Sequence, residues 1–96
     1  MTVFAVEYLY DASTAARRDE VRADHRGWLA GVADRGQLLA SGPYDDGSGA
    51  LLLFKADDAE ALQALLAEDP YSVAGLISGL TSTAWSPVSG PLAAHF

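Results

Sequence analysis

The stretch QLLASGPYDDGSGALLLFKA, residues 37–56, decides the fold that the rest of the chain must complete. Residues 37–44 predict a strand that ends at a Gly-Pro step, and residues 50–56 predict a second strand with an almost continuous apolar run. Between them, residues 45–49 read Asp-Asp-Gly-Ser-Gly, a composition typical of a turn. The stretch therefore predicts a β-hairpin with a long turn.

A helix is predicted on each side of this hairpin. Residues 14–35 carry apolar side chains at helical spacing, and Gly36 follows where a helix should end. Residues 59–68 carry a second apolar helical face. Pro70 ends that helix, because the residue before a proline avoids helical geometry. The hairpin is thus expected to connect two helices in the chain.

Two further strands, residues 3–10 and 77–86, complete the order strand–helix–strand–strand–helix–strand. That order predicts an α+β fold of the ferredoxin-like βαββαβ type, an antiparallel sheet with both helices on one face. Residues 1–96 are expected to form one domain, with residues 87–96 as an irregular tail. Residues 51–54 are apolar on both sides of their strand, so the open sheet face needs a partner and a homodimer is predicted.

Composition limits the classes of function. The chain has 96 residues, no cysteine and a formal net charge of −7. The absence of cysteine excludes disulfides and thiolate metal sites, and the negative charge argues against nucleic acid or an anionic membrane as a partner. The N-terminus lacks the basic start of a signal peptide, and no segment is apolar enough to span a bilayer. These features are typical of a cytoplasmic protein, and no cofactor is expected.

One histidine, His25, lies inside the apolar face of the first predicted helix, four residues after Val21 and four before Leu29. A carboxylate that met it would hold its tautomer and raise its basicity, and Asp69 is the candidate partner. Other interpretations stay open. His25 is then a core histidine that bonds to a backbone carbonyl, and Asp69 only stabilises the turn before Pro70. At a helix C-terminus, this aspartate is expected to cost a little stability.

Two further side chains are candidates for substrate binding. Arg22 lies one turn before His25 and could clamp a carboxylate or phenolate, but a pairing with a neighbour on the same helix such as Asp19 is equally plausible. Tyr71 could donate a hydrogen bond to a substrate oxygen or could serve only in packing. No metal site is predicted, because the second histidine, His95, is in the tail, and one histidine with one carboxylate is a thin ligand set.

Four segments, in this order and at this chain length, match the pattern of one known family: RADHRGWL (22–29), GQLLASGP (36–43), DGSG (46–49) and DPYSVAGL (69–76). With these segments the chain resembles the YCII family of small dimeric α+β-barrel proteins. The resemblance implies a ferredoxin-like protomer paired through its sheet and an active site built on a His–Asp pair, here His25 and Asp69. A dehydrochlorinase of that family, which acts on a chlorinated hydroxyquinol, implies that the scaffold can host lyase chemistry.

Three functions are compatible with these observations. The first is a small enzyme of lyase or isomerase type, in which His25 acts as general acid or base on a small organic substrate and Asp69 supports it. The second is a non-catalytic binding or sensing domain that uses the same pocket for a small molecule. The third is an interaction module that only dimerises. His25 and Asp69 are titratable residues at positions where apolar residues would pack better, which favours the enzyme over the interaction module. Nothing in the sequence separates the enzyme from the binding domain.

Overall fold

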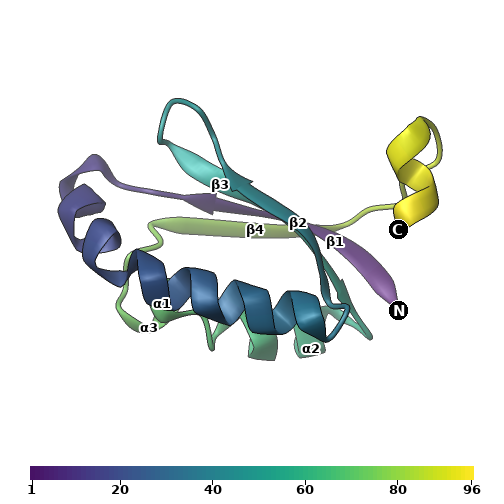
Figure 1. Ribbon diagram of the computed structural model, residues 1–96, viewed down its shortest axis with the longest axis horizontal. Coiled ribbons are helices and arrows are strands. Elements are labelled where there is room, and N and C mark those ends of the chain that lie inside the picture. The colour runs from purple at the N-terminus through teal and green to yellow at the C-terminus, as the bar shows by residue number, and fades with distance from the viewer.

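A computed structural model describes residues 1–96, and its sheet has four antiparallel strands in the order β2-β3-β1-β4 (Figure 1). The strands are β1 (Thr2–Leu9), β2 (Leu38–Pro43), β3 (Gly49–Ala56) and β4 (Gly79–Ala84). The helices are α1 (Ala15–Asp34), α2 (Ala59–Leu66) and the short α3 (Pro70–Val73), with two 3₁₀ turns, η1 (Ala12–Thr14) and η2 (Pro91–His95).

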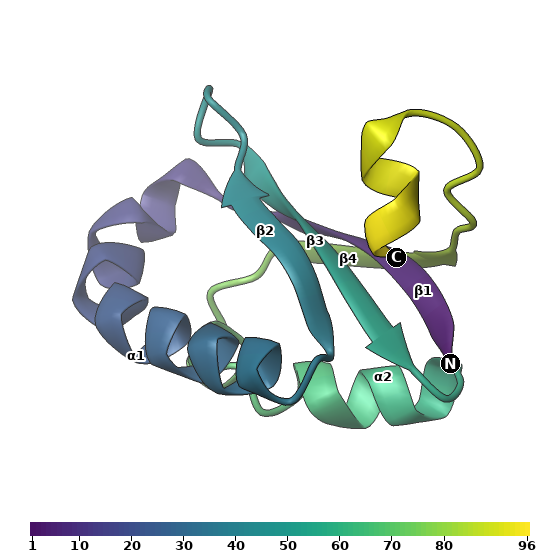
Figure 2. The ribbon, with the colours of Figure 1, turned by 45° about the vertical axis from the view of Figure 1, so that its right-hand side comes forward.

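The predicted α+β, ferredoxin-like arrangement is confirmed. β1 is central, pairing with β3 on one side and β4 on the other, and the hairpin partner β2 forms an edge. Figures 1 and 2 show α1 and α2 on the same side of the sheet, so the opposite face is left open. None of the helices has the length and apolar character that a bilayer-spanning segment requires.

The core lies between the helices and one face of the sheet. Along β1, Phe4, Val6 and Tyr8 are buried, and their neighbours in sequence are less so, as expected for a strand whose successive side chains alternate between faces. Pairing with β3 puts Phe54 beside Phe4 and Leu52 beside Val6 on the same face. The covered face therefore joins the two central strands into one apolar surface.

Helix α1 buries a single face, with Val32 in the cluster on the sheet and Val21 in a smaller cluster with Tyr71 and Leu76. Its buried residues are Arg18, Val21, His25 and Val32, spaced three, four and seven residues apart as one face of a helix requires. The predicted end is confirmed at Gly36, whose φ of 74° lies in the left-handed region that glycine adopts most readily. The same face that supplies apolar packing thus also carries an arginine and a histidine into the interior.

The turn between β2 and β3 is held close to the end of β1. Tyr10 donates its backbone N–H to the carbonyl of Ser48 at 2.9 Å. A Cβ at Gly49 would collide with the carbonyl oxygen of Tyr8, so only glycine allows this approach of the two strands. The close approach brings the hairpin turn over the end of the sheet at which Tyr8 and Tyr10 lie.

The expectation of an irregular tail is wrong for its last part. Pro91–His95 form the 3₁₀ turn η2, with the proline at its first position, where a fixed φ and a missing N–H cost nothing. Phe96 then packs edge-on against Trp85, with ring centroids 5.7 Å apart. An aromatic contact across eleven residues was not readable from the local pattern, which shows only Gly90 and Pro91.

Candidate functional site

Asp69 lies at the junction of α2 and α3 and is completely buried. It is the N-cap of α3: its Oδ1 accepts the backbone N–H of Tyr71 at 2.9 Å, and Pro70 takes the first helical position. The expectation of an unfavourable charge at a helix C-terminus is therefore wrong. Helix α2 ends at Leu66, and the next residues turn so that the carboxylate faces the start of a new helix, where a negative charge is favourable.

The predicted contact between His25 and Asp69 is present, with Nδ1 of the histidine 2.7 Å from Oδ1 of the aspartate. The hydroxyl of Tyr8 donates to Oδ2 at 2.8 Å, so three donors surround this carboxylate. A carboxylate only accepts hydrogen bonds, so the network assigns the proton to Nδ1. Nε2 then carries the lone pair of the neutral ring, and it has no hydrogen-bond partner within the chain.

Tyr71 supports the same histidine from one side. Its ring stacks on the imidazole with centroids 3.9 Å apart and planes 6° apart. Its hydroxyl makes a long contact, 3.4 Å, with the carbonyl oxygen of Arg18, and after Asp19 it also contributes to the raised pKa of the Arg22 guanidinium. The ring and the backbone N–H of Tyr71 thus both hold the His25–Asp69 pair in place, and the substrate-binding role of its hydroxyl stays a prediction.

Tyr8 is the member of this network that sequence reasoning missed. It is completely buried, and burial, followed by the neighbouring Asp69 carboxylate, raises the pKa of its phenol. A phenol on the inward side of a strand, in register with Phe4 and Val6, has to find a hydrogen-bond partner in the core. The alternation along β1 is therefore the sequence signal from which a buried polar partner for Tyr8 could have been predicted.

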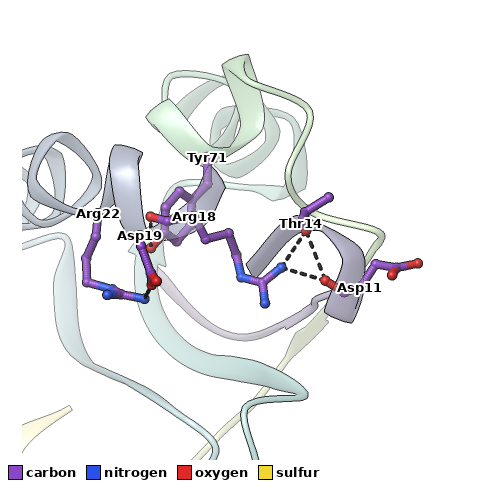
Figure 3. Close-up of polar contacts among 6 residues, drawn as sticks. All are labelled: Asp11, Thr14, Arg18, Asp19, Arg22 and Tyr71. Atoms are coloured by element: carbon purple, nitrogen blue, oxygen red, sulfur yellow. Dashed lines mark hydrogen bonds and ion pairs between the residues drawn. The ribbon is translucent and has the colours of Figure 1, made fainter. Parts of the chain in front are cut away.

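Two arginines of α1, Arg18 and Arg22, lie near Tyr71 and are held differently (Figure 3). Arg18 is buried, with Nη1 donating to Thr14 and to the carbonyl of Asp11 at 2.8 Å. Arg22 pairs with Asp19 at 2.6 Å near the surface, the intrahelical alternative foreseen for it. Its role in binding a substrate stays a prediction.

A cavity of about 470 Å³ opens beside the network, between α1 and the β2–β3 hairpin. His25, Arg22 and Tyr71 line it, whereas Asp69 is buried behind the histidine. Helix α1 and Tyr10 supply more of the wall, and the rest comes from β2, β3 and their turn, which contribute apolar residues, glycines and Ser41. The volume lies in the range of small-molecule sites. Three of the four residues predicted for the site therefore share one hollow, with the fourth in contact with His25.

No group of three or more histidine, cysteine, aspartate or glutamate side chains is placed to hold a metal ion. His95 lies in η2 near the far end of the sheet and does not approach His25. The chemistry that the cavity offers is that of one histidine nitrogen backed by a carboxylate, flanked by cationic side chains.

A family model and several solved structures match this chain. The family model YCII, described as the YCII-related domain, matches residues 1–86. No curated protein sequence matches the chain. The match covers all elements that build the cavity and ends before η2.

Solved structures with the same fold include 5-chloro-2-hydroxyhydroquinone dehydrochlorinase (TftG) from Burkholderia phenoliruptrix, in complex with 2,5-dihydroxybenzoquinone. It is 20% identical, with a TM-score of 0.76 over 86% of this chain and 92% of that one. Rv0793 from Mycobacterium tuberculosis is 13% identical, with a TM-score of 0.57 over 94% and 97%. An uncharacterized NIPSNAP domain protein from Burkholderia xenovorans is 19% identical, with a TM-score of 0.55 over 93% and 96%. At these identities the likeness concerns the fold.

Proposed function

Because the chain belongs to the YCII family, we propose that it is a small enzyme that transfers a proton on a small organic substrate, with His25 as the general base or acid. One observation carries the proposal. His25 binds a buried carboxylate through Nδ1 at 2.7 Å and lines a cavity of about 470 Å³, with Nε2 free of protein partners. An imidazole in that arrangement can accept a proton from a ligand and return it.

The proposed step begins with Nε2 taking a proton from an O–H or C–H bond of the substrate. The electron pair of that bond forms a new π bond. In an elimination, the leaving group departs with the electrons of its own bond; in an isomerisation, the proton returns at another position. Asp69 stabilises the imidazolium that forms, and the stacked ring of Tyr71 holds the imidazole in place.

The solved neighbour TftG supports lyase chemistry as the first class to test, since its printed activity is a dehydrochlorination. The panel therefore comprises hydroxyquinols, haloaromatics and lactones. We expect turnover with the wild type and a fall of about 10²-fold or more in His25→Ala. His95→Ala, which removes the other histidine from the tail, is the matched control and should keep full activity.

The same panel separates the enzyme from a non-catalytic binding or sensing domain. Ligands that bind in the cavity without any turnover, and with equal affinity in His25→Gln, would assign the protein to the binding class. Activity that survives in His25→Ala would remove His25 from the mechanism. A cytoplasmic location stays a prediction from composition.

We also propose a homodimer formed through the open sheet face. β1 and β3 present Ala5, Leu51 and Leu53 on this face, and Leu51 is 42% exposed in the single chain. A second copy of the chain would cover this apolar surface and add to the small buried area of so short a chain. Light scattering at micromolar concentration should give twice the mass of the chain, and Leu51→Lys should shift the mass toward that of one chain. A monomer mass for the wild type would contradict the proposal.

A further inference from the structure

We infer that the ligand of this cavity is a small organic anion, a carboxylate or an ionised phenol, whose charge is received by Arg18, Arg22 and Arg26. The inference rests on the proposed function for the place where the ligand reacts, and it adds the chemical class that the proposed function leaves open. It is carried by the partners of Arg18 and by the distribution of charge around the cavity.

Arg18 is a buried cation that forms no ion pair within the chain. It is 7% exposed, and its guanidinium contacts a backbone carbonyl, the Thr14 hydroxyl and the face of the Tyr10 ring, 4.5 Å from the ring centroid. None of these partners carries a negative charge, and no carboxylate forms an ion pair with it. A buried charge is costly unless it is paired, so an anion in the adjoining cavity would complete the site.

The charges of the chain are distributed unevenly around the cavity. The whole chain has six lysine and arginine residues against thirteen aspartate and glutamate residues. Three of the six cations, Arg18, Arg22 and Arg26, lie in the cavity wall, and none of the acidic residues does. The three arginines are four residues apart on α1, so they form a single cationic row along one side of the helix. An overall acidic protein thus presents a cationic hollow.

Two members of the row are available to a ligand. The side chain of Arg26 makes no hydrogen bond or ion pair within the chain. Arg22 pairs with Asp19, but the two side chains are 44% and 65% exposed, and such surface pairs contribute little. Its planar guanidinium has five donors, so it can bind a ligand oxygen while keeping or exchanging that pair.

The opposite wall indicates the rest of the ligand. Leu52 of β3 provides an apolar contact there, and Leu29 extends the apolar lining at the α1 side, beyond the row of arginines. The rings of Tyr10 and Tyr71 meet edge-on with centroids 6.0 Å apart, and they lead from the guanidinium of Arg18 to the stacked imidazole of His25. An organic anion with an apolar body can therefore place its charge at the arginines and its reacting bond near Nε2.

The test compares benzoate with benzamide, which has nearly the same shape without the charge. Each is titrated into the protein of residues 1–96 while NMR follows the ring signals of Tyr10, His25 and Tyr71. We expect benzoate to bind about tenfold more tightly than benzamide, although the net charge of −7 repels anions at long range. Arg26→Gln should weaken benzoate by about threefold, and Arg18→Met should abolish the preference.

Arg17→Gln is the matched control, because it removes the same charge from the same helix outside the cavity, and it should leave the preference unchanged. Arg18→Lys keeps a cation and should retain part of the preference if Arg18→Met does not fold. Equal affinity for the two compounds, no binding of either, or shifts confined to residues outside the cavity would overturn the inference. Because the titration needs no turnover, an intact preference for benzoate in a protein without activity would reject the proposed enzyme and leave the ligand class standing.

Discussion

The two ends of the covered sheet face are equally buried, but different interactions stabilise them. At the apolar end, Val32, Phe54 and Leu62 are completely buried and pack against each other. At the polar end, Asp69 is just as buried, and Tyr8 and His25 hold it by hydrogen bonds of 2.8 and 2.7 Å. The same layer of one small protein thus contains a region stabilised by apolar burial and a region stabilised by paired polar groups.

The difference shows where this fold has room for chemistry. Replacing a buried polar network by well-packed apolar side chains is often neutral or stabilising, so the polar end contributes less stability than apolar packing could. It is also the end that borders the cavity of about 470 Å³, which is lined by His25 and by none of Val32, Phe54 and Leu62. This separation supports the proposal that the polar end serves a reaction and that the apolar end carries the fold.

The sharpest test of the apolar end is Phe54→Ala. The ring is completely buried, contacts Trp28 across 6.2 Å between centroids, and would leave a cavity in the core. We expect the free energy of unfolding to fall by about 3–5 kcal/mol, measured by chemical denaturation. Leu80→Ala, at a side chain that is 43% exposed, is the control and should cost less than about 1 kcal/mol. Similar losses in both variants would mean that the apolar end is not the main source of stability.

Asp69→Asn tests the polar end and should have the next largest effect. The amide replaces one acceptor by a donor among three hydrogen-bond donors, so we expect a loss of about 1–3 kcal/mol of unfolding free energy. Nitrogen NMR of His25 should also show a smaller share of the tautomer protonated at Nδ1. Asp58→Asn is the matched control, because asparagine caps a helix as well as aspartate does and Asp58 only caps α2. An unchanged tautomer in Asp69→Asn would contradict the assignment of the network.

Tyr8→Phe removes the hydroxyl that donates to Asp69, and it tests the network through the pH dependence of the free energy of unfolding. Burial raises the pKa of Tyr8 above its ordinary value and raises that of Tyr10 to about 12. A raised phenol pKa means that the neutral form favours the folded state. The contribution is therefore complete below the unfolded pKa of about 10 and is lost as the pH rises through the folded values.

Phenylalanine at position 8 should remove part of this alkaline loss of unfolding free energy and cost about 1 kcal/mol at neutral pH, the contribution of one hydrogen bond. Denaturation at a series of pH values from neutral upward measures both effects. Tyr44→Phe, at a hairpin phenol that is hydrogen-bonded to Glu7, should change the alkaline loss less. An alkaline loss that is the same in wild type and Tyr8→Phe would mean that another group causes it.

The smallest effect is expected from a chain that ends at Ser89. The deletion removes η2 and the contact between Phe96 and Trp85, both remote from the two ends of the covered face. We expect the fold to persist, with a loss below about 1 kcal/mol and an unchanged NMR signal for His25. Failure of this shortened chain to fold would show that the tail belongs to the core.

The order of elements could be predicted because each one carries its own local signal. The apolar spacing of residues 14–35 and the glycine that follows predict a helix, and the structure has it at Ala15–Asp34. The hairpin followed from a turn composition between two apolar runs. Given those elements in that order, very few antiparallel arrangements cover the sheet with both helices, so the fold followed as well.

The environment of the site depended on contacts between distant parts of the chain. Tyr8 and Asp69 are 61 residues apart, and His25 and Asp69 are 44 apart, so no local pattern could show that all three share one hydrogen-bond network. The resemblance named the His25–Asp69 pair but said nothing of Tyr8. It also said nothing of Arg18, which folding buries without an ion pair. Periodicity reports which side of an element is covered, whereas partners, burial and charge balance arise only when separate elements pack together.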